Sequence, residues 1–168
     1  MDDAEASERE VTETPAAAAA GDHSEAVADT IERELREEAE SHGLFGLLGV
    51  ELVSARDGRA VLTLPFEEEF TNLANVSMHG GLTATLVDTA SGFALRSVLG
   101  ADATLTTTDM NVRYLRPATN DLRVEAEVVR AGTTMGVTEA RVTSEHEGEE
   151  KVVATGGTSY RLFRGENA

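Results

Sequence analysis

Apolar residues recur with two different periods along the chain, and each period predicts a different kind of element. Between residues 24 and 41 they return at every fourth position, at Val27, Ile31 and Leu35, and Gly43 follows as a stop signal. The apolar stripe is narrow, so this segment is predicted to be a helix on the surface of the fold.

From residue 50 onward the period changes to two, which predicts β-strands. A short apolar turn leads into two alternating runs that flank the turn dipeptide Asp57-Gly58, an arrangement typical of a β-hairpin. Four more β-rich stretches follow Gly100, with turn residues between them. They cover residues 103–115, 121–131, 133–145 and 150–163.

One segment between these strands, residues 81–99, is apolar nearly all round. A helix with this pattern is expected to be buried, with a sheet wrapped around it. The predicted fold class is therefore α+β, an antiparallel sheet around one long central helix. A single carboxylate, Asp88, lies in the middle of this helix, where burial is costly unless it is hydrogen-bonded or opens onto a pocket. Gly92, one turn later on the same face, leaves room for a group to approach.

The composition divides the chain into an acidic tail, a surface helix and a folded domain. Its 168 residues suit one domain with a tail, and 14 of the 31 acidic side chains fall within the first 40 residues. Residues 1–23 are acidic and low in complexity, with nothing to bury, so we expect a disordered tail there. The surface helix at 24–41 and a folded domain at 42–164 follow.

The charge narrows the possible partners. The formal net charge is −17, and only one of the 14 basic side chains is a lysine. A field of this sign repels nucleic-acid phosphates and anionic membranes, so neither is an expected partner. Such a composition resembles that of proteins from halophilic microbes, where high salt screens self-repulsion. With no membrane-length apolar run, no signal-like N-terminal segment and no cysteine, we expect a soluble cytoplasmic protein without disulfides or thiolate sites.

Two motifs carry a resemblance to a known family: HGGLTATLVD, which begins at His79, and TTTDMNVRYLRPA, which begins at Thr106. Together they resemble the PaaI-type acyl-CoA thioesterases of the hotdog fold, including the group of thioesterase superfamily member 2, over residues 42–164. The family's nine-residue spacing between histidine and acid is kept from His79 to Asp88. The resemblance implies hydrolysis of an acyl-CoA to a free acid and coenzyme A. It implies no metal or cofactor, since coenzyme A is part of the substrate, and the acyl group stays open.

The residues of the first motif suit this chemistry. Gly80 and Gly81 fall where the helix begins, so their N–H groups have no intrahelical partner and lie at the positive end of the helix dipole. A thioester carbonyl placed there is polarised, and the resemblance assigns the oxyanion donor to the Gly80 amide. Asp88 is then either the general base that activates water or the nucleophile that attacks the carbonyl.

The resemblance also implies supporting residues. Thr107 matches the hydroxyl that positions water, but Thr106 competes because the spacing from the acid is one residue longer than the family's. Asn72 matches the asparagine that orients the water or the carbonyl, with Asn75 as the alternative in a loop that is also one residue longer.

Four further residues are expected at the substrate. His79 and Gly81 begin the helix, and His79 is expected to hold the loop by hydrogen bonds and not to act as a base. Arg113 and Arg116 are candidates for binding the coenzyme A phosphates, with pairing to the protein's own carboxylates as the alternative. The histidines are not clustered with acids, so no metal site is expected.

Hotdog domains pair so that two sheets become one, with the active site at the interface. The resemblance therefore implies a homodimer at least, and we expect a homotetramer. Asn72 and Gly80 would come from one chain, and Asp88 and Thr107 from its partner. Two other functions stay open: a hotdog 2-enoyl-CoA hydratase, whose Asp/His pair the sequence does not show, and a non-catalytic acyl-CoA-binding module.

Overall fold

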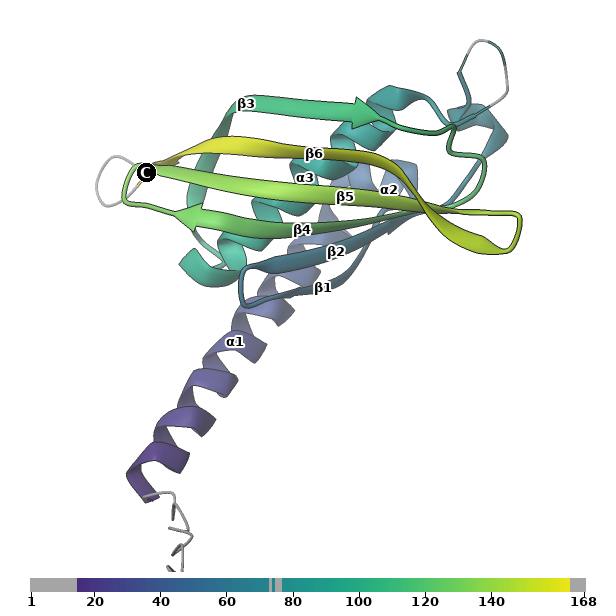
Figure 1. Cartoon of the computed structure of the whole chain (residues 1–168). Coiled ribbons are helices and arrows are strands. Elements are labelled where there is room, and N and C mark those ends of the chain that lie inside the picture. Colours follow the sequence, from purple (N-terminus) through teal and green to yellow (C-terminus); the bar gives the residue numbers. More distant parts are fainter. Residues whose placement is uncertain (1–14, 73, 75–76, 164–168) are drawn as a thin grey trace, which may run out of the picture.

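The chain folds into one antiparallel sheet and a long helix that lies against it (Figure 1). The computed structural model describes residues 15–72, 74 and 77–163. The helices are α1 Pro15–Ser41, α2 Gly43–Leu48 and α3 Gly80–Leu99, with a 3-10 turn, η1, at Glu68–Phe70. The strands are β1 Glu51–Arg56, β2 Arg59–Leu64, β3 Thr104–Tyr114, β4 Leu122–Ala131, β5 Met135–His146 and β6 Glu149–Phe163.

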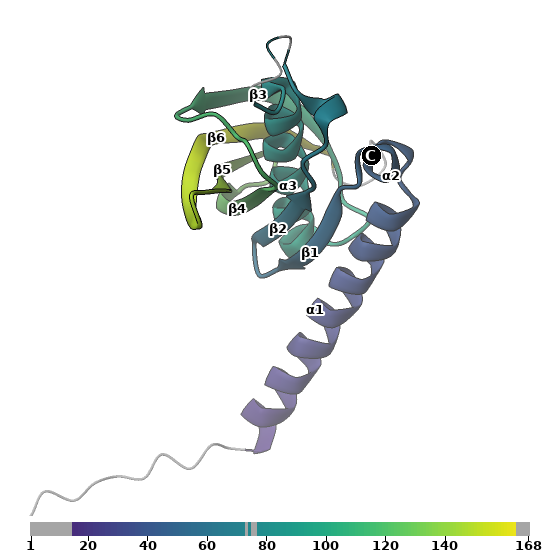
Figure 2. The ribbon, with the colours of Figure 1, turned by 90° about the vertical axis from the view of Figure 1, so that its right-hand side faces the viewer.

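The sheet has the strand order β1-β2-β4-β5-β6-β3 and curves around α3 (Figure 2). Leu86, Val87 and Ala90 of α3 are buried, and they belong to one core with inward-facing strand residues such as Leu62 and Val124. The predicted α+β fold, an antiparallel sheet wrapped around one long central helix, is confirmed. The four strand predictions after Gly100 and the hairpin also hold to within a few residues. None of the described helices is long and apolar enough to cross a membrane.

The hairpin turn forms where the dipeptide predicts it. Asp57 and Gly58 both have positive φ, at 52° and 80°. Two consecutive left-handed residues produce the turn whose twist matches that of the flanking strands. The turn sets the pairing of Ala55 with Ala60, and a register shift at Val53 then pairs Leu52 with Leu62, so that both leucines are buried.

The two edges of the sheet differ. α1 lies along β1, where Arg36 donates hydrogen bonds to the main-chain oxygens of Leu52 at 2.5 Å and Val53 at 2.9 Å. Glu32 accepts from the main-chain N–H of Ala55 at 3.2 Å. These side chains occupy main-chain groups that a further strand would need. The other edge, β3, is exposed over most of its length.

Two segments differ from the sequence prediction. α1 begins at Pro15, nine residues before the predicted start at 24, so residues 15–23 belong to a helix and not to the predicted tail. Proline is favoured in the first turn, and a run of alanines has the highest helix propensity. The rest of the predicted tail lies outside the described residues. The apolar segment before β1 forms the short helix α2 instead of a turn, because Phe45 is buried against the core.

Candidate active site

The carboxylate of Asp88 is half-buried on the face of α3 that meets β3 and β6. Its Oδ1 accepts a hydrogen bond from the Thr107 hydroxyl at 2.8 Å and another from the Tyr160 hydroxyl at 3.1 Å. The Tyr160 hydroxyl also lies 2.5 Å from the main-chain oxygen of Asp88. The charge that the sequence places in an apolar helix is therefore supported by two donors from the sheet, as a buried carboxylate requires.

The strand register decides between the two candidate threonines. Thr107 is paired with Tyr160, so both side chains lie on the inner face, whereas Thr106 is paired with Arg161 and points to the other face. The register shifts between Thr107 and Asp109, which identifies a β-bulge at Thr108. This bulge is where β3 accommodates one extra residue. Of the two threonines, Thr107 is the one in contact with Asp88.

The N-terminus of α3 forms a second group of polar atoms. His79 is the N-cap, and its Nδ1 accepts a hydrogen bond from the Gly81 N–H at 3.0 Å. Its main chain is fixed as well, since its N–H donates a hydrogen bond to the main-chain oxygen of Phe70 at 2.7 Å. His79 thus holds the loop by hydrogen bonds, as expected. The Gly81 amide is engaged by this bond, and its predicted contact with the substrate stays a prediction.

The Gly80 amide differs from that of its neighbour. Across residues 15–72, 74 and 77–163, its N–H donates to no acceptor. The Gly80 carbonyl accepts from the Tyr114 hydroxyl at 2.7 Å, and the Tyr114 ring lies directly against the glycine. The first turn of α3 therefore offers one unpaired donor at the positive end of the helix dipole.

Asn72 lies close to this donor. Together with Gly80, Tyr114 and Arg116 it lines a cavity of about 400 Å³. Its amide is bonded inside the loop, to the Ser77 hydroxyl at 3.0 Å and to the N–H of Ala74 at 3.0 Å. The alternative residue, Asn75, lies outside the described residues. Asn72 and Gly80 are therefore brought together.

The two groups do not meet within one chain. Neither Asp88 nor Thr107 lines the cavity at Gly80. Gly80 and Asp88 are eight residues apart on one helix, which corresponds to about 12 Å along its axis. A single small carbonyl group cannot contact both.

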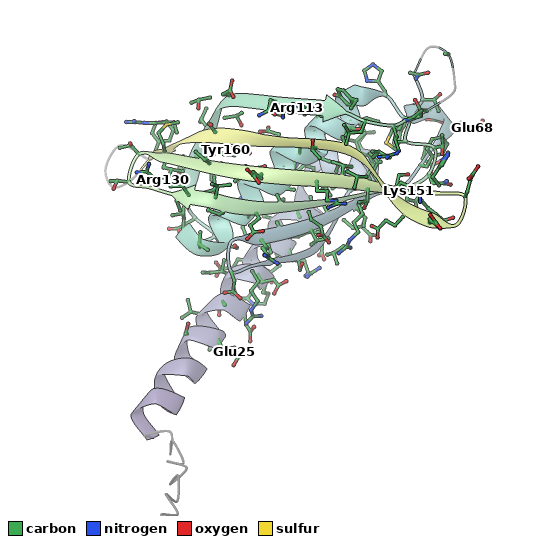
Figure 3. The ribbon with its side chains drawn as sticks, in the orientation of Figure 1. Glu25, Glu68, Arg113, Arg130, Lys151 and Tyr160 are labelled. Carbon is green, nitrogen blue, oxygen red and sulfur yellow. The ribbon has the colours of Figure 1, made fainter. Side chains whose placement is uncertain are left out.

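The two arginines lie in different places. Arg116 lines the cavity at Gly80 and donates to the main-chain oxygen of Val152 at 2.7 Å. Arg113 lies on β3 (Figure 3) and donates to Asn111 at 3.2 Å. It lines a larger hollow of about 1060 Å³ on the outer face of the sheet, which contains neither Gly80 nor Asp88. Among the described residues, neither arginine forms an ion pair with a carboxylate.

Sequence reasoning missed both tyrosines of the chain. Tyr160, labelled on β6 in Figure 3, is 2% exposed, and burial together with the charge of Asp88 raises its pKa well above the ordinary value. Gly92 lies beside this hydroxyl, since a Cβ built there would be in van der Waals contact with the phenol oxygen at 3.5 Å. The glycine one turn after Asp88 was visible in the sequence, but the tyrosine that contacts Asp88 there lies 72 positions away in the chain.

No group of three or more metal-ligating side chains occurs in the part of the chain that the structure describes. The expectation of no metal and no cofactor stays a prediction.

Comparison with known proteins places these features in a family context. The model of the thioesterase superfamily matches residues 76–151, which include both motifs. A proposed esterase of Halobacterium salinarum is 44% identical over 132 residues, covering 74% of this chain and 87% of that protein. Human acyl-coenzyme A thioesterase 13 is 38% identical over 113 residues, 64% of this chain and 75% of that protein. The crystal structure of zebrafish thioesterase superfamily member 2 is similar at 31% identity and a TM-score of 0.67, covering 82% of this chain and 99% of that chain.

Proposed function

The chain belongs to the thioesterase superfamily, and from this premise we propose that it hydrolyses an acyl-CoA to a free carboxylic acid and coenzyme A. Family membership confirms the resemblance based on the two motifs, including the likeness to a protein from a halophilic microbe. A relative named as an acyl-coenzyme A thioesterase supports coenzyme A as the thiol. The observation that carries the proposal is the pair of half-sites on α3: a Gly80 amide that donates to no acceptor among the described residues, and an Asp88 carboxylate supported by two hydroxyls.

Asp88 is the residue that starts the reaction. Its carboxylate either takes a proton from water as the water attacks the thioester carbonyl, or attacks the carbonyl itself to form an anhydride. Thr107 donates to Oδ1 at 2.8 Å and holds the carboxylate in place for either route. In both cases the coenzyme A thiolate leaves and water supplies the second oxygen of the product acid.

The Gly80 amide is the proposed oxyanion donor. Negative charge develops on the thioester oxygen as the carbonyl carbon becomes tetrahedral, and a fixed N–H at a helix N-terminus stabilises that charge. His79 supports this geometry by holding the first turn of α3, since it caps the helix through the neighbouring Gly81 amide. Asn72 lines the same cavity and is proposed to orient the carbonyl or the water.

We propose that the complete site forms between two chains. Because about 12 Å separates Gly80 from Asp88 along one helix, the two can act on one carbonyl only if they come from different chains. The edge at β1 is occupied by side chains of α1, which leaves β3 as the edge available for pairing with a second copy. Thr107 lies on that strand. Asn72 and Gly80 of one chain would then face Asp88 and Thr107 of its partner, and a homotetramer would combine two such dimers.

Arg116 and Arg113 are proposed to bind the coenzyme A phosphates. Both guanidinium groups lack a carboxylate partner among the described residues, although the chain carries an excess of acid. Arg116 is favoured because it lines the cavity that contains Gly80. Cytoplasmic location and the absence of nucleic-acid and membrane partners stay predictions from composition.

The test is free-thiol release from a panel of acyl-CoAs at high salt, with wild type and Asp88→Asn compared. We expect release by the wild type and a loss of about a thousandfold or more in kcat for the variant, because removing the base or nucleophile removes the chemical step. Asp109→Asn, on the outward face of β3, is the matched control and should retain activity.

Two results would contradict the proposal. A folded wild type that binds an acyl-CoA but releases no thiol would favour a non-catalytic binding module. Conversion of a 2-enoyl-CoA to its hydrated thioester, without thiol release, would favour the hydratase.

A further inference from the structure

We propose that Tyr160 is a positioning residue that determines which oxygen of Asp88 performs the chemistry. The inference rests on the proposed role of Asp88 and adds a residue that lies outside the two motifs. It is carried by the contacts around this carboxylate and by the burial of the tyrosine.

The two oxygens of the carboxylate have different surroundings. Oδ1 accepts from the Thr107 hydroxyl at 2.8 Å and from the Tyr160 hydroxyl at 3.1 Å. Among the described residues no donor is bonded to Oδ2. Two donors on Oδ1 draw negative charge toward that atom and fix the plane of the carboxylate. Oδ2 keeps its lone pairs for a water molecule or for direct attack on a carbonyl carbon.

Tyr160 bonds to the main chain and the side chain of the same residue. Its hydroxyl lies 2.5 Å from the Asp88 main-chain oxygen and 3.1 Å from Oδ1, so its one proton is shared between the two acceptors. This arrangement fixes the carboxylate relative to the helix that carries it. Thr107 alone could not do so, because it contacts the side chain from the exposed edge strand.

The rest of the molecule holds the phenol in place. The Tyr160 ring packs in a small buried cluster with Leu95 and Leu162. The hydroxyl lies against Gly92, where a Cβ would be 3.5 Å from its oxygen. Burial and the charge of Asp88 raise the pKa of Tyr160, so the phenol stays a proton donor throughout the pH range in which the enzyme would work.

The first experiment compares Tyr160→Phe with wild type in thiol release. We expect kcat to fall about 10-fold to 100-fold and KM to change less than about threefold, because a misoriented carboxylate impairs the chemical step and not substrate binding. Leu162→Val is the matched control. It loosens the same cluster but removes no donor, so kcat should stay within about twofold of wild type.

A double variant tests whether the two hydroxyls act on the same atom. If Thr107 and Tyr160 both fix Oδ1, the losses in Thr107→Val and Tyr160→Phe should be coupled, and the double variant should lose less than their product. Independent, multiplicative losses would contradict a shared role. A Tyr160→Phe protein that folds and keeps the wild-type kcat, or a Leu162→Val protein that loses as much, would overturn the inference.

A second readout does not depend on catalysis. In protein labelled with ¹³C in its aspartate carboxyl groups, the infrared band of Asp88 can be assigned from its disappearance in Asp88→Asn. Tyr160→Phe should shift this band, because one hydrogen bond to Oδ1 is lost. An unshifted band would overturn the inference whether or not the wild type is active. If Tyr160→Phe shifts the band but the wild type hydrolyses no thioester, the contact is supported and only the proposed function is overturned.

Discussion

The two half-sites on α3 are built from different kinds of contact. At the N-terminus, His79, Gly80 and Gly81 are consecutive, and the cap that fixes them spans two residues. At Asp88, the donors arrive from strands that lie 19 and 72 residues further along the chain. A helix terminus supplies an unpaired N–H by itself, whereas a carboxylate in an apolar helix needs polar partners from elsewhere in the fold.

Each half-site also contains one of the two tyrosines, and these two side chains differ in how exposed they are. Tyr114, which bonds to the Gly80 carbonyl, is 57% exposed, and Tyr160, which bonds to Asp88, is 2% exposed. The half with the carboxylate is therefore largely complete within one chain. The half with the amide lies at the exposed edge strand of the sheet, which is the edge proposed to pair with a second chain.

Among changes that disable one half-site and leave the other intact, the largest effect is expected at Gly80. Gly80→Pro removes the N–H but suits the first position of a helix, and the extended His79 (ψ 127°) before it is compatible with proline. We expect kcat to fall about 10²-fold to 10³-fold, the usual loss for one oxyanion donor. Gly80→Ala is the control, since it adds the same Cβ beside Tyr114 but keeps the N–H. Equal activity in the two variants would contradict the oxyanion role.

Mixed dimers test whether the halves belong to different chains. Gly80→Pro and Asp88→Asn chains should each be nearly inactive alone. Random pairing makes half of the dimers hybrid, each with one intact site of two, so co-expression should restore about a quarter of wild-type activity. Thiol release and mass measurement of the dimers would follow this. No recovery in verified hybrids would place both halves in one chain.

A smaller effect is expected at the threonine that supports Asp88. Thr107→Val removes one hydrogen bond to Oδ1 and should lower kcat about 10-fold, with little change in KM. Thr106→Val, on the other face of β3, should stay within about twofold of wild type. The opposite ranking of the two variants would show that the strand register differs in the active protein.

The smallest effect is expected at the arginines. Arg116→Ala should raise KM for an acyl-CoA about threefold to tenfold without lowering kcat, because phosphate contacts are the same in the ground and transition states. An acyl-pantetheine thioester, which lacks the nucleotide phosphates, should show no change. Arg113→Ala is the comparison, since it lies in the other hollow. A larger effect at Arg113 than at Arg116 would indicate that the nucleotide of coenzyme A binds on the outer face of the sheet.

Much of the fold could be predicted because its determinants are local. The period of two in the strands, the Asp57-Gly58 turn and the apolar residues around α3 are all readable within short windows. The start of α1 was missed because composition alone predicts disorder for a stretch of alanine and acid, whereas alanine also favours helix.

Only part of the candidate site could be predicted, because some of its determinants are local in sequence and others are not. Its motif residues were found from their spacing, and Thr107 could not be separated from Thr106 until the bulge at Thr108 was known. The hydrogen bond from the Gly81 amide to His79 depends on the conformation of the histidine side chain, and the spacing of residues in a motif does not determine that conformation. Arg113 and Arg116 differ by three positions in sequence, yet they line different hollows because the strand ends at Tyr114 between them.

The sequence by itself determined that this chain would bury one long apolar helix in an antiparallel sheet, with two glycines at its start and one carboxylate at its centre. The tertiary structure decided what supports that carboxylate and how far it lies from the glycines. The physical reason is that hydrophobic period and capping act over a few residues, whereas Thr107 and Tyr160 reach Asp88 only after β3 and β6 have paired. The α1 side chains on β1 likewise leave β3 as the uncovered edge, and no local pattern encodes that contact.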